Sequence, residues 1–207
     1  YPPNETGGAE LATHTLAGAL IGRGHTVGVF ARTTDRGAAE FSLKREGNDF
    51  RTADGGNAPT VYRIVNNRDQ ISTFSMEYAN PFVNESFRSV LDDFRPDIVH
   101  VQHVAHLSGE IITGAARLGY PLILSLHDLF FACYRYHLIN NNLELCAGPD
   151  EGKRCIDCLK AVAKPEEALH RYAYLSKILR IPQQVVVPSL FLARRITEIF
   201  PFLEPYL

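Results

Sequence analysis

Residues 95–128, RPDIVHVQHVAHLSGEIITGAARLGYPLILSLHD, contain the pattern that decides the fold. Two short, mainly apolar runs at 98–101 and 122–126 flank a stretch, 111–118, in which apolar residues recur with a helical period. Strands that are apolar on both faces are typical of a parallel sheet covered by helices on each side. The segment therefore predicts a strand, a helix and a second strand joined by a right-handed connection.

The same alternation extends along the chain in both directions. Further strands are expected at 27–31, 60–65 and 185–187, and further helices at about 8–22, 83–94, 166–179 and 189–200. The first helix carries small residues on one stripe, which would let it lie close to a sheet: Ala9, Ala12, Leu16, Ala19 and Leu20. Residues 35–59 are polar and glycine-rich without periodicity, which favours a functional loop.

The predicted fold class is α/β, a doubly wound, Rossmann-like parallel sheet in one domain over 1–207. A cysteine-containing insert is expected at about 129–160. A doubly wound sheet would also have a central strand before the first helix, and this sequence contains no strand there. Ligands of such sheets bind at the carboxyl ends of the strands.

The composition excludes several classes of protein. Hydrophobic residues make up 45% and charged residues 21%, as in globular rather than disordered chains. Lys and Arg number 21 against 23 Asp and Glu, so there is no basic excess for binding nucleic acid. No apolar run approaches the roughly 18–20 residues of a membrane helix. The four cysteines are too few and too local for a secreted disulfide scaffold, so an intracellular, soluble chain is expected.

Gly7 and Gly8 open the first predicted helix. Glycine lets the backbone approach a ligand closely, and a helix N-terminus offers unpaired N–H groups and the positive end of the dipole. This arrangement suits a diphosphate. The alternative interpretation is a plain tight turn.

Histidines gather where two predicted strands end. His103 follows the strand at 98–101, and His127 with Asp128 follows the strand at 122–126. His127 can bond a sugar hydroxyl or carry a proton, and Asp128 can hold His127, bind a hydroxyl or cap the next turn. His100 is interpreted as a core histidine and His106 as a surface loop residue, and their spacing does not by itself indicate a metal site.

The insert contains all four cysteines, in the pattern Cys133-x12-Cys146-x8-Cys155-x2-Cys158. The Cys155-x2-Cys158 pair with two further thiols can form a tetrahedral zinc site. A polar insert with little apolar content would need such a metal to fold around. Free thiols, one or two disulfides, and a redox pair are the alternatives. The insert begins with aromatic and basic residues, 130–137, which either line an acceptor site or pack the insert onto the domain.

Taken together, these segments resemble the N-terminal domain of GT-B-fold glycosyltransferases of family 4. The matching motifs occur in the family's order over nearly the whole chain: YPP-x3-GGAE at 1–10, LAGALIGRGHTV at 16–27, RPDIVHVQH at 95–103, LHDLFF at 126–131 and VPSLFL at 187–192. The four-cysteine insert also resembles one found in a subset of this family.

The resemblance implies transfer of a sugar from a nucleotide sugar to a glycan or glycolipid acceptor, with retention at the anomeric carbon, as in polysaccharide biosynthesis. Gly7 and Gly8 would face the donor diphosphate, and His127 would be the catalytic residue that contacts the transferred sugar. The acceptor side would include Glu10, His103 and Asp128. Catalysis would need no metal or cofactor, because the helix dipole and basic side chains stabilise the leaving group.

The family's nucleotide-binding half, with its Glu-x7-Glu motif and Arg/Lys pair, belongs to a C-terminal domain that this sequence does not contain. We therefore expect no transfer by the chain alone. A cytoplasmic location is expected, with peripheral contact at the inner membrane face. A non-catalytic, zinc-stabilised interaction module is the main alternative. A dinucleotide enzyme is disfavoured because G-x-G-x-x-G is missing around residues 7–35. The transferase interpretation requires Gly7, Gly8 and His127 to meet in one crevice.

Overall fold

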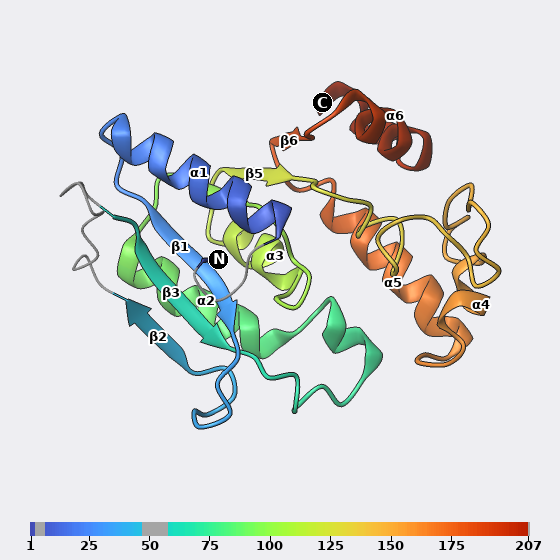
Figure 1. Cartoon of the computed structure of the whole chain (residues 1–207), viewed down its shortest axis with the longest axis horizontal. Coiled ribbons are helices and arrows are strands. Elements are labelled where there is room, and N and C mark those ends of the chain that lie inside the picture. Colours follow the sequence, from blue (N-terminus) through green and yellow to red (C-terminus); the bar gives the residue numbers. More distant parts are fainter. Residues whose placement is uncertain (3–6, 47–57, 207) are drawn as a thin grey trace. The chain divides into compact units, whose positions relative to one another are not determined.

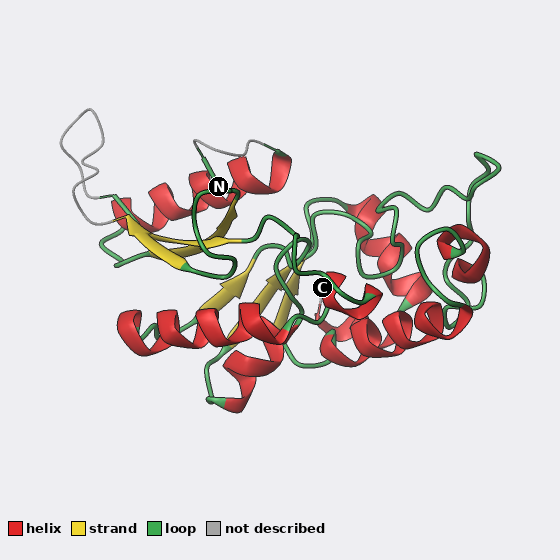
Figure 2. Cartoon of the chain, turned by 90° about the horizontal axis from the view of Figure 1, so that it is seen from below, coloured by secondary structure: helices red, strands yellow, loops and turns green. Residues whose placement is uncertain are grey.

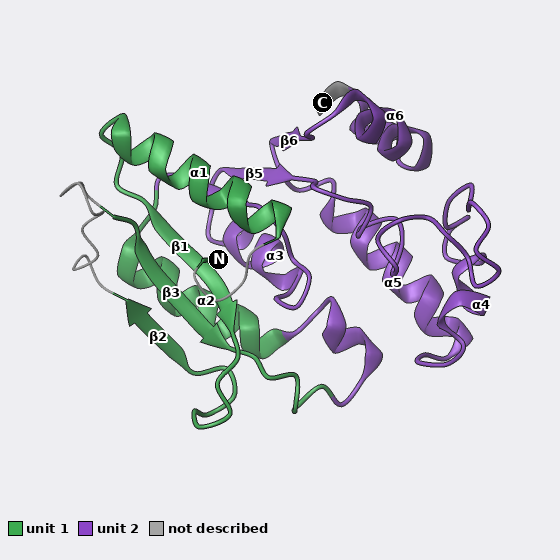
Figure 3. Ribbon diagram, in the orientation of Figure 1, with its two compact units in different colours: residues 1–71, 81–96 green, residues 72–80, 97–207 purple. Residues whose placement is uncertain are grey.

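The computed structural model describes residues 1–2, 7–46 and 58–206. The chain divides into two compact units (Figure 3). The first comprises Tyr1–Ile71 and Pro81–Pro96, and the second comprises Ser72–Asn80 and Asp97–Leu207. Each unit contains one three-stranded sheet with parallel strands, which confirms the α/β class. A single doubly wound sheet is not among the described strand pairs, and the single domain stays a prediction.

The first unit is built around a sheet with the strand order β1-β3-β2 (Figure 1). Its elements are α1 (Gly8–Gly22), β1 (Gly28–Thr33), β2 (Leu43–Glu46), β3 (Thr60–Val65) and α2 (Pro81–Phe94). β1 and β3 are parallel, and β2 runs antiparallel to β3. The two helices lie on opposite faces of the sheet (Figure 2).

Alternation along β1 explains how both faces are covered. Val29 and Ala31 are buried in a cluster with Ala17 of α1. The intervening Phe30 packs its ring against Phe87 of α2, with 5.1 Å between the ring centroids. Because successive side chains of a strand point to opposite faces, one short apolar strand anchors a helix on each side.

The second unit contains a parallel sheet with the order β4-β5-β6. Its elements are η1 (Phe74–Glu77), β4 (Val99–Val101), α3 (Glu110–Arg117), β5 (Leu122–Ser125), α4 (Cys155–Leu159), α5 (Pro165–Ile178), β6 (Gln184–Val186), α6 (Leu190–Ile199) and η2 (Pro201–Tyr206). The predicted strand–helix–strand over 98–126 is confirmed as β4, α3 and β5. Ser189 caps α6 as expected, because its Oγ accepts a hydrogen bond from the Leu192 N–H at 3.2 Å. None of the described helices has the length and apolar content to cross a bilayer.

Two details of the first unit differ from the sequence-based expectation. Ala17 is the buried residue of α1, whereas Ala12 and Ala19 of the predicted stripe are exposed. Alanines occur on every side of this helix, so its periodicity is weak. The segment 35–59 also contains β2, which the polar composition of that segment did not predict. Residues 47–57 of the segment lie outside the described residues.

Buried Arg63 of β3 forms hydrogen bonds with both β2 and the start of the chain. Its side chain is 2% exposed and donates to Glu46 Oε1 at 2.7 Å. It also donates to the carbonyl oxygens of Tyr1 and Pro2, at 3.1 and 2.7 Å. One guanidinium therefore joins β2 and the start of the chain to the central strand.

Replacing Arg63 by methionine is expected to lower the free energy of unfolding by roughly 2–3 kcal/mol, because a carboxylate and two carbonyls lose a charged donor. Urea unfolding followed by circular dichroism measures this. Arg36→Met is the control, since the Arg36–Asp69 ion pair at 3.4 Å is largely exposed and its loss should cost far less. Equal losses of unfolding free energy for Arg63→Met and Arg36→Met would contradict the stabilising role given to Arg63.

Candidate active site

The carboxyl ends of β4 and β5 bring polar side chains together within the second unit. The register pairs Val101 with Leu124, so the residues that follow these positions leave the sheet side by side. Gln102 and His103 come from the end of β4, and His127 and Asp128 follow β5. Open parallel sheets bind their ligands at this edge.

His103 and Asp128 form a pair across the two strand ends. His103 Nε2 lies 3.1 Å from Asp128 Oδ2, and the Ala105 N–H donates to His103 Nδ1 at 2.9 Å. Because Nδ1 accepts, the ring hydrogen is on Nε2 and is donated to the carboxylate. The side chains are 23% and 36% exposed, so both are accessible to a ligand.

Asp128 also caps the turn that follows β5. Its Oδ1 accepts a hydrogen bond from the Phe130 N–H at 2.8 Å. Of the roles considered from the sequence, the carboxylate performs the cap, and it holds His103 rather than His127. One carboxylate thus sets the direction of the loop and the orientation of an imidazole.

His127 is held by a residue to which the sequence analysis assigned no role. Its Nε2 lies 2.9 Å from Gln102 Oε1, and because an amide oxygen only accepts, Nε2 carries the hydrogen. Its position one residue after the end of β4 could have marked Gln102 as a site residue, because ligands bind at this edge of the sheet. His100 Nε2 is hydrogen-bonded to Ser125 Oγ at 2.9 Å. Burial, and then the neighbouring His127, lower the pKa of His100, which fits the interpretation of a neutral core histidine.

Aromatic residues of the segment 129–160, the predicted insert, lie beside His103. The His103 ring lies edge-on to Phe130, 5.5 Å away, and is stacked with Tyr136 at 6.3 Å. Phe130 is buried and packs the insert onto the unit, whereas Tyr136 is half-buried. Burial, followed by the charge of Asp128, raises the pKa of Tyr136, so its hydroxyl stays protonated. The stretch 130–137 therefore supplies both packing and a surface next to the polar pair.

Gly7 and Gly8 open α1 in the first unit, as predicted. Neither has a positive φ, so a left-handed turn does not require glycine there. Among described atoms, nothing lies within 4 Å of a Cβ built on Gly8. The Gly7 N–H donates to Glu10 Oε2 at 2.9 Å, so a carboxylate of the chain itself occupies this amide. Since His127 belongs to the other unit, its meeting with these glycines stays a prediction.

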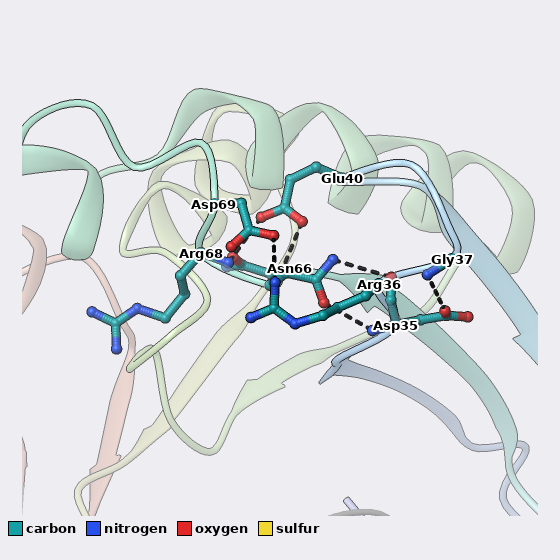
Figure 4. A network of polar contacts seen from close by, with 8 residues as sticks. Asp35, Arg36, Gly37, Glu40, Asn66, Arg68 and Asp69 are labelled. Carbon is teal, nitrogen blue, oxygen red and sulfur yellow. Dashed lines mark hydrogen bonds and ion pairs between the residues drawn. The ribbon is translucent and has the colours of Figure 1, made fainter.

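A network of polar contacts orders the carboxyl edge of the first sheet (Figure 4). The Asp35 N–H donates to Asn67 Oδ1 at 2.9 Å, and Asn67 Nδ2 donates to the Asp35 carbonyl at 3.1 Å. The Glu40 carboxylate accepts from the N–H groups of Asn67 and Arg68, both at 2.9 Å. These bonds fix the start of the predicted loop 35–59 against residues 66–69.

The four cysteines are half-buried and free of disulfides. All of them line one small pocket in the insert: Cys133, Cys146, Cys155 and Cys158. Burial, and next the neighbouring Cys133, raise the pKa of Cys155 to about 11. In the part of the chain that the structure describes, no three His, Cys, Asp or Glu side chains form a ready-made metal cage. The predicted zinc site therefore stays a prediction.

A family model, described as Glycosyltransferase Family 4, matches residues 6–204. The chain belongs to glycosyltransferase family 4. The match confirms the resemblance seen in the sequence motifs and includes every candidate site residue named above. No curated protein and no solved structure matches the chain.

Membership of family 4 connects the fold with the chemistry. The α/β units with parallel strands agree with the Rossmann-like domain of GT-B glycosyltransferases. A family 4 domain implies a nucleotide-sugar donor and an acceptor as substrates. The residues at the ends of β4 and β5 thus lie in a glycosyltransferase domain. This family assignment disfavours the dinucleotide enzyme considered from the sequence.

Proposed function

We propose that this chain is the acceptor-side domain of a retaining glycosyltransferase, which moves a sugar from a nucleotide sugar to a glycan or glycolipid. One observation carries the proposal. In a family 4 domain, His103, Asp128 and His127 lie together at the carboxyl edge of the β4–β5 sheet, each with a defined hydrogen-bond partner. A site that binds sugar hydroxyls needs such a small set of preorganised polar groups.

His127 is proposed to contact the transferred sugar. Its bond to Gln102 holds the hydrogen on Nε2, so the imidazole is kept in one tautomer and one orientation toward the sugar. An imidazole fixed in one tautomer and one orientation costs little reorganisation when charge develops in the transition state.

The His103–Asp128 pair is proposed to bind the acceptor. Asp128 can accept a hydrogen bond from an acceptor hydroxyl, and its bond to His103 keeps the carboxylate in place. Phe130 and Tyr136 give the same region an apolar wall. A few fixed polar groups beside aromatic surface are typical of small-molecule sites.

The donor diphosphate is proposed to bind at Gly7 and Gly8, at the N-terminus of α1. No divalent metal is needed for this step, because backbone N–H groups and the helix dipole attract the anion. The diphosphate would replace the Glu10 carboxylate at the Gly7 N–H. In the family, further residues that neutralise the leaving group come from the C-terminal domain, so we expect the 207-residue chain alone to transfer no sugar.

The test is a screen of nucleotide sugars and saccharide or lipid acceptors with the chain joined to a family 4 C-terminal domain. Product formation is followed by mass spectrometry and the anomeric configuration by NMR. Transfer with retention is the expected result. Inversion, or no transfer with any donor although the joined protein is folded and binds nucleotide, would overturn the proposal.

A further inference from the structure

The cysteine pocket has the size and the lining of a closed site for one metal ion. Its cavity of about 20 Å³ holds a single water-sized particle. The four thiols come from three segments. Cys133 lies in the segment after β5, and Cys146 follows Leu145, which forms an isolated β-bridge with Ile139. Cys155 and Cys158 lie one turn apart on α4. The fold therefore gathers every cysteine of the chain around one small cavity.

A buried cation lies beside this pocket. Arg171 of α5 is 4% exposed and donates to the Phe130 carbonyl at 2.6 Å. Its guanidinium also lies over the Phe130 ring, 5.0 Å from the centroid. The thiols of Cys155 and Cys133 are among the electrostatic neighbours of this guanidinium. A buried charge is costly unless it is paired, and thiolates at these two positions would supply negative charge beside Arg171.

We propose that Cys133, Cys146, Cys155 and Cys158 bind one zinc ion as a structural tetrathiolate site. Each thiol releases a proton to solvent as its Zn–S bond forms, and no oxidation or reduction is involved. Four thiolates and one Zn²⁺ carry a net charge of 2−, because their charges sum. Arg171 offsets part of this charge from the buried side, and Arg135 and Arg154 line the same pocket.

Charge also distinguishes a zinc tetrathiolate from two disulfides formed by the same four cysteines. Two disulfides are neutral and would add no negative charge beside the buried Arg171, whereas a zinc tetrathiolate would. The described side chains do not form a metal cage, so zinc binding would require the four thiols to move closer together. Four protein ligands leave no open coordination position, which makes the site structural rather than catalytic.

The metal would hold the aromatic wall of the acceptor site. The segment 129–160 buries Leu138 and Leu159 but leaves Leu143 82% and Leu145 88% exposed. The same insert carries Phe130 and Tyr136, which pack against His103. Closing the insert on zinc would therefore fix this wall. Only this last link rests on the proposed function.

The first test is metal analysis of the purified chain. We expect about one zinc per chain, four thiols that become reactive only after chelation, and tetrahedral thiolate bands in the visible spectrum when Co²⁺ replaces zinc. Disulfides without metal, or four freely reactive thiols without metal, would overturn the proposal. The readout is independent of sugar transfer, so it fails or succeeds separately from the proposed function.

Two substitutions test the ligands. Cys158→Ser is expected to weaken zinc binding at least about 100-fold, since changing a residue that only supports a metal ligand already costs about 10–100-fold. Ile139→Ala is the matched control, because Ile139 lines the same pocket without a ligand atom, and its zinc content should stay unchanged. If Cys158→Ser fails to fold, the cobalt spectrum of the unsubstituted chain still decides.

Arg171 tests the argument from charge. Arg171→Met is expected to weaken zinc binding about 10–100-fold, and Arg171→Lys, which keeps a positive charge, should recover part of the loss. Competition with a chromophoric chelator measures both affinities. Equal affinities for Arg171→Met and the unsubstituted chain would show that this cation does not balance the site.

Discussion

Replacing His127 by alanine in an active form of the enzyme is expected to lower kcat about 100- to 1000-fold, the effect of removing one preorganised hydrogen-bonding group at a reacting centre. The side chain is half-buried at the end of β5 and held by Gln102 at 2.9 Å, so little of the loss should come from unfolding. Steady-state kinetics with saturating donor and acceptor measure the change in kcat.

The control for His127 is His170→Ala. His170 is exposed on α5 in the same unit, and its replacement should leave kcat unchanged. Gln102→Leu should lower kcat about tenfold, since the imidazole remains but is no longer oriented. A His127→Ala enzyme within threefold of the parent would remove His127 from the mechanism.

Replacing Asp128 by asparagine is expected to raise the acceptor KM and lower kcat/KM for the acceptor about 10- to 100-fold. The reason is the fixed tautomer of His103. Its Nδ1 accepts from the Ala105 N–H, so Nε2 must donate, and an amide oriented to keep the Phe130 cap would present a second donor to it. Acceptor titrations at saturating donor measure the effect.

Two readouts separate this role of Asp128 from a structural one. The donor KM should stay near that of the parent enzyme, and so should the urea midpoint, because asparagine can still accept from the Phe130 N–H. His103→Ala should reproduce the rise in acceptor KM. Equal rises in the donor and acceptor KM values would contradict a position on the acceptor side.

The strand–helix–strand over 98–126 was predictable because its signal is local. Apolar periodicity and Gly119 after α3 define it without reference to the rest of the chain. β2 was not predictable in the same way. Its residues, Leu43–Glu46, are mostly charged, and the strand exists because its backbone pairs with β3 and Glu46 meets Arg63.

The position of the candidate residues at the strand ends was predictable, but their hydrogen-bond partners were not. His127 and Asp128 are adjacent in the sequence, which suggested that they act on each other. Successive residues leaving a strand point to opposite sides, so each instead meets a residue from β4's end, Gln102 or His103. Likewise, cysteine spacing indicated zinc, whereas the counter-charge of Arg171 depends on how α5 packs.

The bond between Glu10 and the Gly7 N–H has a consequence for selectivity. The first turn of α1 is already neutralised by a tethered anion, so free phosphate from the surroundings gains little by binding there. A ligand must bring additional contacts to displace the carboxylate, as a diphosphate that carries a nucleoside and a sugar does. If the donor diphosphate binds here as proposed, the Glu10 carboxylate would favour the complete donor over small free anions.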